Sequence, residues 1–147
     1  MRDLKKIATK LKRFSNRNDV LNNILGSLEK AILNLNRDQM YEDGVMDINS
    51  PGAILHYAPS TVKGKKRRAE FPRTDHITLK WDNTFHPSLK IEYKADSFLI
   101  YSDNRVWKAY LQPQDRFENA LGLTDESLAL LREWVLSKIV KRFRNAI

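Results

Sequence analysis

The apolar residues of this chain repeat with a helical period near both ends and with a period of two in the middle. Apolar and charged residues alternate strictly from Leu89 to Lys94, which is typical of a strand with one dry and one wet face. These patterns predict an α+β fold, in which N- and C-terminal helices pack on a small antiparallel β-sheet with a long basic loop.

The 147 residues are expected to form a single α+β domain. We expect residues 1–44 to be a helical N-terminal part, 45–76 an extended basic loop, 77–111 antiparallel strands and 112–147 a helical C-terminal part. A domain of this size buries roughly 68–70% of the surface of its unfolded chain, so its core needs no covalent staples.

Three segments have a helical stripe of apolar residues. The first runs from Leu4 to Phe14, and the second runs from Val20 to Leu35 after an interruption at Ser15–Asp19. The last helix is expected to begin at Thr124, a favourable N-cap residue, and two carboxylates follow in the first turn, where the helix dipole favours them. Its core stripe comprises Leu128, Leu131, Val135, Ile139 and Phe143.

The middle of the chain predicts three or four strands separated by turn residues. These are Ile77–Lys80, Leu89–Lys94, Ser97–Ser102 and, on a weaker pattern, Val106–Leu111. The segment Phe98–Tyr101 is apolar on both faces, so it is expected to be the most buried strand.

Composition excludes several classes of site. The chain has no cysteine, which rules out disulfides, thiolate zinc sites and cysteine nucleophiles. No apolar run approaches the ~20 residues of a membrane span, and no apolar signal core begins the chain. We therefore expect a soluble protein that is made in the cytoplasm. The net charge of +8 favours polyanions or acidic protein faces as partners.

The residues do not form a recognisable catalytic set. His56, His76 and His86 are not part of an H-E-x-x-H motif, and neither a G-x-S-x-G motif nor a P-loop is present. We expect no catalytic, cofactor-binding or metal-binding residue, and hence no enzyme. A weaker alternative is an accessory enzyme that uses His76 or His86.

Positive charge gathers in a run that lacks apolar periodicity and is expected to be a solvated loop. Its candidate docking residues are Lys63, Lys65, Lys66, Arg67 and Arg68. With Tyr57, Phe71 and Trp81 as stacking partners, the same loop would suit nucleic-acid phosphates. The alternative is a solubilising loop, or one that orders only against a partner.

A second candidate surface lies on the last helix. Leu130 and Trp134 are one turn apart and project away from the core stripe, and Lys138 follows one turn later. Such a spot either packs against the chain's own loops or forms an interface between subunits, where tryptophan is frequent among hot-spot residues.

The order of these signals resembles small virion proteins of tailed phages and prophages of Bacteroidetes. The shared features are Gly52–Thr61 with its tyrosine, the Lys/Arg run, Thr78-Leu79, Phe85–Ile91, and Gly122–Ser127 at the start of the last helix. The resemblance covers roughly residue 47 to the C-terminus. One departure is Trp81–Thr84, which replaces an aspartate-threonine-glycine turn. We expect Asn83 to adopt the positive φ that the turn requires.

The resemblance implies, by analogy with tail-completion and minor tail proteins, a head–tail connector or neck subunit that assembles into a ring. Implied partners are portal, connector or tail subunits, further copies of the chain, and packaged DNA by nonspecific contact, but no membrane. The implied location is the neck or tail of the virion. The alternative is a nonspecific nucleic-acid-binding protein.

Overall fold

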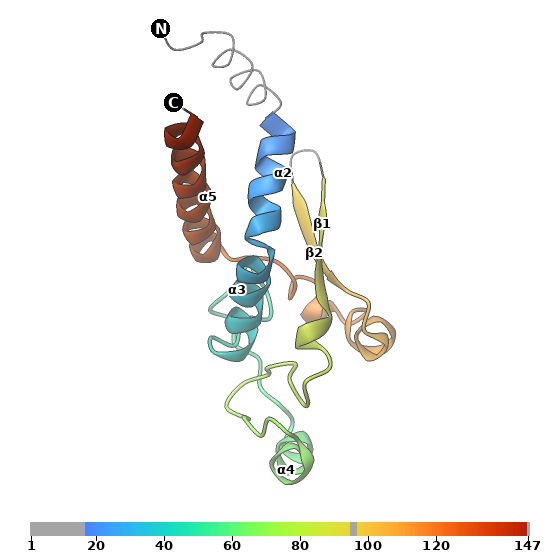
Figure 1. The fold of residues 1–147 in the computed structure, drawn as a ribbon. Helices are drawn as coiled ribbons and strands as arrows, with labels where there is room; N and C mark the ends of the chain where they lie inside the picture. The colour runs from blue at the N-terminus through green and yellow to red at the C-terminus, as the bar shows by residue number, and fades with distance from the viewer. Residues whose placement is uncertain (1–16, 95–96, 147) are drawn as a thin grey trace, which may run out of the picture.

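A computed structural model describes residues 17–94 and 97–146. The elements in chain order are α2 (Arg17–Ser27), α3 (Glu29–Tyr41), α4 (Pro59–Arg68), η1 (His86–Ser88), β1 (Leu89–Tyr93), β2 (Phe98–Ser102), η2 (Trp107–Leu111), η3 (Asp115–Phe117) and α5 (Asp125–Ala146). Helices from both ends of the chain pack with an antiparallel hairpin, which confirms the predicted α+β class (Figure 1). The predicted helix Leu4–Phe14 lies outside the described residues.

The second predicted helix is in fact two helices with a break at Leu28. The hydroxyl of Ser27 donates to the carbonyl of Ile24 (2.7 Å), and Leu28 N–H donates to the carbonyl of Leu25 (3.0 Å). Such local bonds compete with the regular ladder and bend the chain. α3 therefore takes a new direction below α2 (Figure 1). α2 already begins at Arg17, inside the predicted interruption.

β1 and β2 form a two-stranded antiparallel hairpin in which Ile91 pairs with Ile100. Ile100 is 4% exposed, whereas Leu99 is 47% exposed. Phe98–Tyr101 was predicted to be the most buried strand because both of its faces are apolar, but it buries only one face, since the rest of the molecule covers one side of this hairpin.

The other two predicted strands are absent from the structure. In Ile77–Lys80, Leu79 has a φ of +52°, which is incompatible with extended backbone. In Val106–Leu111, the side chain of Asn104 accepts a bond from Trp107 N–H (3.0 Å) and starts a helical turn. Trp107 is then buried and stacks on Phe85, with 4.8 Å between ring centroids.

Two buried amides of α3 hold the segment that leads into α5. Asn36 donates to the carbonyl of Ala120 and accepts from Gly122 N–H. Gln39 donates to the carbonyl of Gly122 and accepts from Thr124 N–H. Thr124 in turn caps α5 as predicted, since its hydroxyl oxygen accepts from Ser127 N–H (3.2 Å).

The molecule is elongated, and its two ends have different elements. α5 runs beside α2 at one end, while α4 lies at the other end, below α3 (Figure 1). Leu131 of α5 is buried, and Leu128 and Val135 pack beside it against the core. None of the helices in residues 17–94 and 97–146 combines the length and apolar character needed to cross a membrane.

Candidate docking surface

The basic segment is a helix, not the extended loop that the sequence predicted. α4 begins with Pro59, whose missing N–H costs nothing at the start of a helix. Its last turn carries Lys65, Lys66, Arg67 and Arg68, where the partial negative charge of the helix C-terminus favours cations. The proline at the start and the cations in the last turn thus favour a helix here, although the segment has no apolar stripe.

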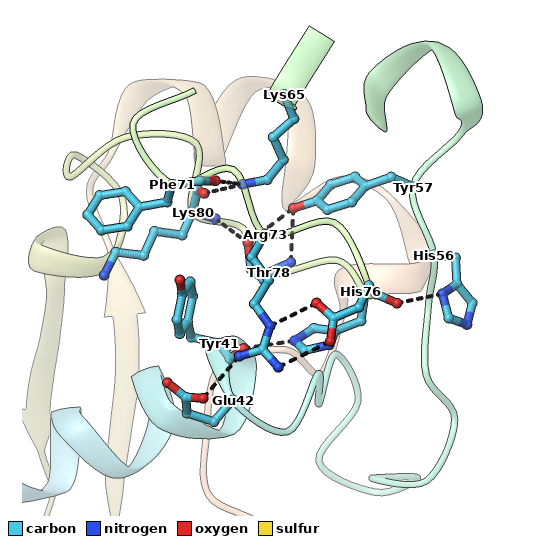
Figure 2. Close-up of polar contacts among 11 residues, drawn as sticks. Tyr41, Glu42, His56, Tyr57, Lys65, Phe71, Arg73, His76, Thr78 and Lys80 are labelled. Atoms are coloured by element: carbon cyan, nitrogen blue, oxygen red, sulfur yellow. Dashed lines mark hydrogen bonds and ion pairs between the residues drawn. The ribbon is translucent and has the colours of Figure 1, made fainter. Parts of the chain in front are cut away.

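Lys65 is fully buried and holds α4 on the loop beneath it. Its ammonium donates to the carbonyl oxygens of Phe71 and Lys80, the latter at 2.6 Å, and lies 5.7 Å from the centre of the Tyr57 ring. Figure 2 shows these contacts converging on Nζ. With no solvent exposure, this side chain cannot contact a partner, so its predicted docking role is wrong.

The buried ammonium is stabilised by carbonyl dipoles, and no carboxylate of the described residues pairs with it. Burial lowers the pKa of Lys65 below its ordinary value, because the charged form loses hydration. Charge-assisted bonds to two carbonyls replace part of that hydration. Lys65 therefore acts as a structural peg.

The other four predicted docking residues point into solvent. Lys63, Lys66, Arg67 and Arg68 are all exposed. At 3.6 residues per turn, the first three lie on the side of α4 opposite Lys65. Within the described part of the chain, none of the four forms an ion pair. We call this set the α4 cationic face.

The loop below α4 is stiffened by aromatic and hydroxyl contacts. The hydroxyl of Tyr57 accepts from Thr78 N–H (3.0 Å) and lies 3.2 Å from the Thr78 hydroxyl. The ammonium of Lys80 lies 4.0 Å from the Phe71 ring centre and 5.0 Å from that of Tyr41. These cation–π contacts bring residues from three separate segments together.

Arg73 ties the same loop to the end of α3. Its guanidinium forms a two-pronged bond to Asp75 (2.8 and 3.1 Å) and a third bond to Glu42 (3.0 Å). The hydrogen bond from Arg73 lowers the pKa of Asp75 to about 2. The bond to Asp75 likewise raises the pKa of Arg73. Both groups are thus ionised at neutral pH.

The histidines hold the loop in place. His76 is buried, donates from Nε2 to the Tyr41 carbonyl (2.8 Å) and faces Asp75 through Nδ1 (3.2 Å). His86 donates from Nε2 to the Thr78 carbonyl (2.9 Å), and burial lowers its pKa to about 4. His56 is exposed. The described residues contain no group of three or more acidic or histidine side chains arranged to hold a metal.

One aromatic ring lies beside the α4 cationic face. Trp81 is 43% exposed, and a Cβ placed on Gly64 of α4 would meet its ring at 3.7 Å.

The turn after Trp81 is closed by Asp82, whose carboxylate accepts from the N–H and the hydroxyl of Thr84. The predicted positive φ at Asn83 is wrong, because Leu79, which precedes this turn, is the non-glycine residue with a positive φ among the described residues.

The second predicted surface lies apart from the first, on α5. Leu130 is 41% exposed and Lys138 is exposed. Trp134 is half-buried and packs against the core, as expected for a residue that contacts its own chain. A role for these three residues between subunits stays a prediction.

Sequence reasoning missed the supports of α4 and the full apolar surface of α5. Phe71 and Lys80 meet only because the chain folds back, with Phe71 N–H donating to the Trp81 carbonyl (3.2 Å), and no local pattern signals this. Leu136 and Val140, by contrast, are four residues apart and exposed, so their helical spacing was visible in the sequence.

Comparisons with protein-family models, with curated proteins and with solved structures found no match to this chain.

Proposed function

We propose that this protein is a structural subunit of a tailed-phage particle, at the neck or the tail terminus, which docks onto a neighbouring virion protein through the α4 cationic face. Its work is geometric and electrostatic, and no bond is made or broken. The observation that carries the proposal is a row of unpaired cations on a helix that is pegged to its own domain.

The rigid mounting matters because a preformed surface loses little conformational entropy when it binds. Lys65, Arg73 and His76 fix α4 and its supporting loop before any partner arrives. The proposed partner is the acidic face of a portal, connector or tail subunit. Complementary charge of this kind speeds association and selects the correct neighbour.

The two-ended shape supports a role as a connector. α4 lies at one end of the molecule and α5 extends toward the other (Figure 1). A subunit that contacts the next layer through one end can contact copies of itself through another face, as the head-to-tail interfaces of a ring require. Leu130, Trp134 and Lys138 are the proposed subunit contact.

Reversing the charge of Lys63, Lys66 and Arg67 to glutamate tests the docking role. We expect the triple variant to fold and to associate with particles at least roughly tenfold less than the wild type, because like charges now oppose docking. Sedimentation of infected-cell particles, followed by immunoblotting, measures the bound fraction.

A matched control reverses three exposed cations elsewhere, at Lys30, Arg105 and Lys108. This variant has the same net charge and should associate normally. Equal incorporation of both variants, at equal folded amounts, would disprove docking through α4.

A second candidate function is nonspecific nucleic-acid binding, which the position of Trp81 beside the α4 cationic face favours. Bases stack on such rings while phosphates contact the cations. If all four cations of the face neutralise phosphates, duplex affinity should fall with salt at a log–log slope of about −3.6. Negligible DNA affinity at physiological salt would leave the connector role alone.

A further inference from the structure

An apolar groove runs between α2, β2 and α5, at the end of the molecule away from α4. Its volume is about 740 Å³. Leu25, Ile100 and Leu131 lie in its buried floor, and the exposed Leu99 and Leu136 lie at its rim. A groove of this volume is in the range of sites that bind a ligand or a peptide segment.

Within the described part of the chain, the charged residues that line the groove are both positive. Lys94 and Arg132 line it, and no acidic side chain does so in the part of the chain that the structure describes. Both cations are exposed, and Arg132 lies one helical turn from Leu136 on α5. An occupant must therefore bring apolar side chains for the floor and negative charge for the rim.

These charges disfavour the chain itself as the occupant. Met1–Arg17 has seven basic residues and one acidic residue, so it would place further positive charge against Lys94 and Arg132. A second copy that docked groove to groove would place its own Lys94 and Arg132 against the same two cations.

We propose that the groove docks an amphipathic helix of a partner protein whose polar face is acidic. α5 borders the groove from Leu128 to Leu136, a rise of about 12 Å, which matches two turns of a docked helix and its i, i+4 and i+7 anchors. The inference is independent of the α4 cationic face and of any phage role.

The width of the apolar surface distinguishes a helix from a thin acyl chain. Beyond the floor, Leu21 is 37%, Leu99 47% and Leu136 60% exposed. These residues come from three different elements. A docked helix covers all three at once, whereas an acyl chain in the floor leaves the rim in water.

The test uses two designed peptides and the full-length protein. Both peptides have leucine at i, i+3, i+4 and i+7, and the opposite face carries glutamate in one and lysine in the other. Fluorescence anisotropy should show the acidic peptide binding at least roughly tenfold more tightly. Lys94→Glu with Arg132→Glu should reverse this preference.

Controls keep the result interpretable. Arg105→Glu with Lys108→Glu changes the net charge equally at exposed sites outside the groove, and should keep the preference of the wild type. Leu136→Ser, at an exposed position, should weaken both peptides while circular dichroism stays unchanged.

Three results would overturn the inference. The first is equal or undetectable binding of the two peptides. The second is displacement of the acidic peptide by stoichiometric dodecanoate, which would identify an acyl-chain site. The third is self-association that Leu136→Ser abolishes, which would identify a second copy as the occupant.

Discussion

Lys65 anchors α4 to the rest of the domain, a role that buried apolar side chains usually have in a helix. α4 has few apolar residues, and Lys65 is the one residue of this helix whose side chain is buried. The flexible stem crosses the space below the helix and the ammonium ends among carbonyl oxygens. A shorter or uncharged side chain would leave those carbonyls without a donor.

Lys65→Met should therefore lower the free energy of unfolding by about 1–3 kcal/mol, the usual cost of leaving buried polar groups unpaired. Methionine fills nearly the same volume as the aliphatic part of lysine, so the lost stability measures the contribution of the ammonium group. Urea unfolding followed by circular dichroism measures it. Lys66→Met, at an exposed position of the same helix, should change stability by less than about 0.5 kcal/mol. Equal losses of stability in the Lys65 and Lys66 variants would contradict the structural role of Lys65.

His86 makes stability depend on pH. Its folded pKa is about 4, below the ordinary value of 6.5, so the unfolded chain binds the proton more readily. The contribution is complete above pH 6.5 and is lost as pH falls toward 4, by about 3 kcal/mol in total. Urea midpoints across this range should fall less steeply in His86→Gln than in the wild type.

His56→Gln is the control for removing a histidine from an exposed position, where its Nδ1 donates to the Asp75 carbonyl. Identical profiles for the wild type and His86→Gln would show that His86 is not held neutral in the fold.

At the scale of elements, the hairpin divides its residues into a buried and an exposed set. Ile100 belongs to the core, and Leu99 beside it faces outward. The alternation of apolar and charged residues along β1 predicted that the hairpin has one buried and one exposed face. The apolar run of β2 concealed it, because Leu99 looks like a core residue in sequence yet lines the rim of the groove.

Ile100→Ala should cost about 2–5 kcal/mol, since it removes buried methyl groups and leaves a cavity. Leu99→Ala should cost less than about 0.5 kcal/mol, because its side chain is half in water. Thermal or urea unfolding compares the two. A larger loss at Leu99 than at Ile100 would mean that the hairpin presents its opposite face to the core.

Elements with strong end signals were predictable, and those set by distant contacts were not. Thr124 marked the start of α5, and the β1 pattern marked the hairpin. The irregular backbone at Ile77–Lys80 depends on Tyr57, which bonds Thr78 from another segment. The helical turn at Trp107 depends on the Asn104 cap and on stacking with Phe85, which outweigh β-propensity.

At the scale of the whole molecule, the sequence predicted the class of fold and the exposure of four of the five cations in the basic run. It did not predict that the fifth, Lys65, is a buried support, because alternate residues of a basic run look alike in sequence. Nor did it predict the groove, whose walls come from α2, β2 and α5. Surfaces assembled from separate elements depend on tertiary packing, which no single stretch of sequence records.

The pegged helix separates two tasks that often conflict within a small domain. The residues that keep α4 in place are Lys65 and its carbonyl acceptors, whereas the side chains of Lys63, Lys66 and Arg67 are exposed. The exposed residues of α4 can therefore be substituted during evolution to fit a new partner without lowering the free energy of unfolding of the domain.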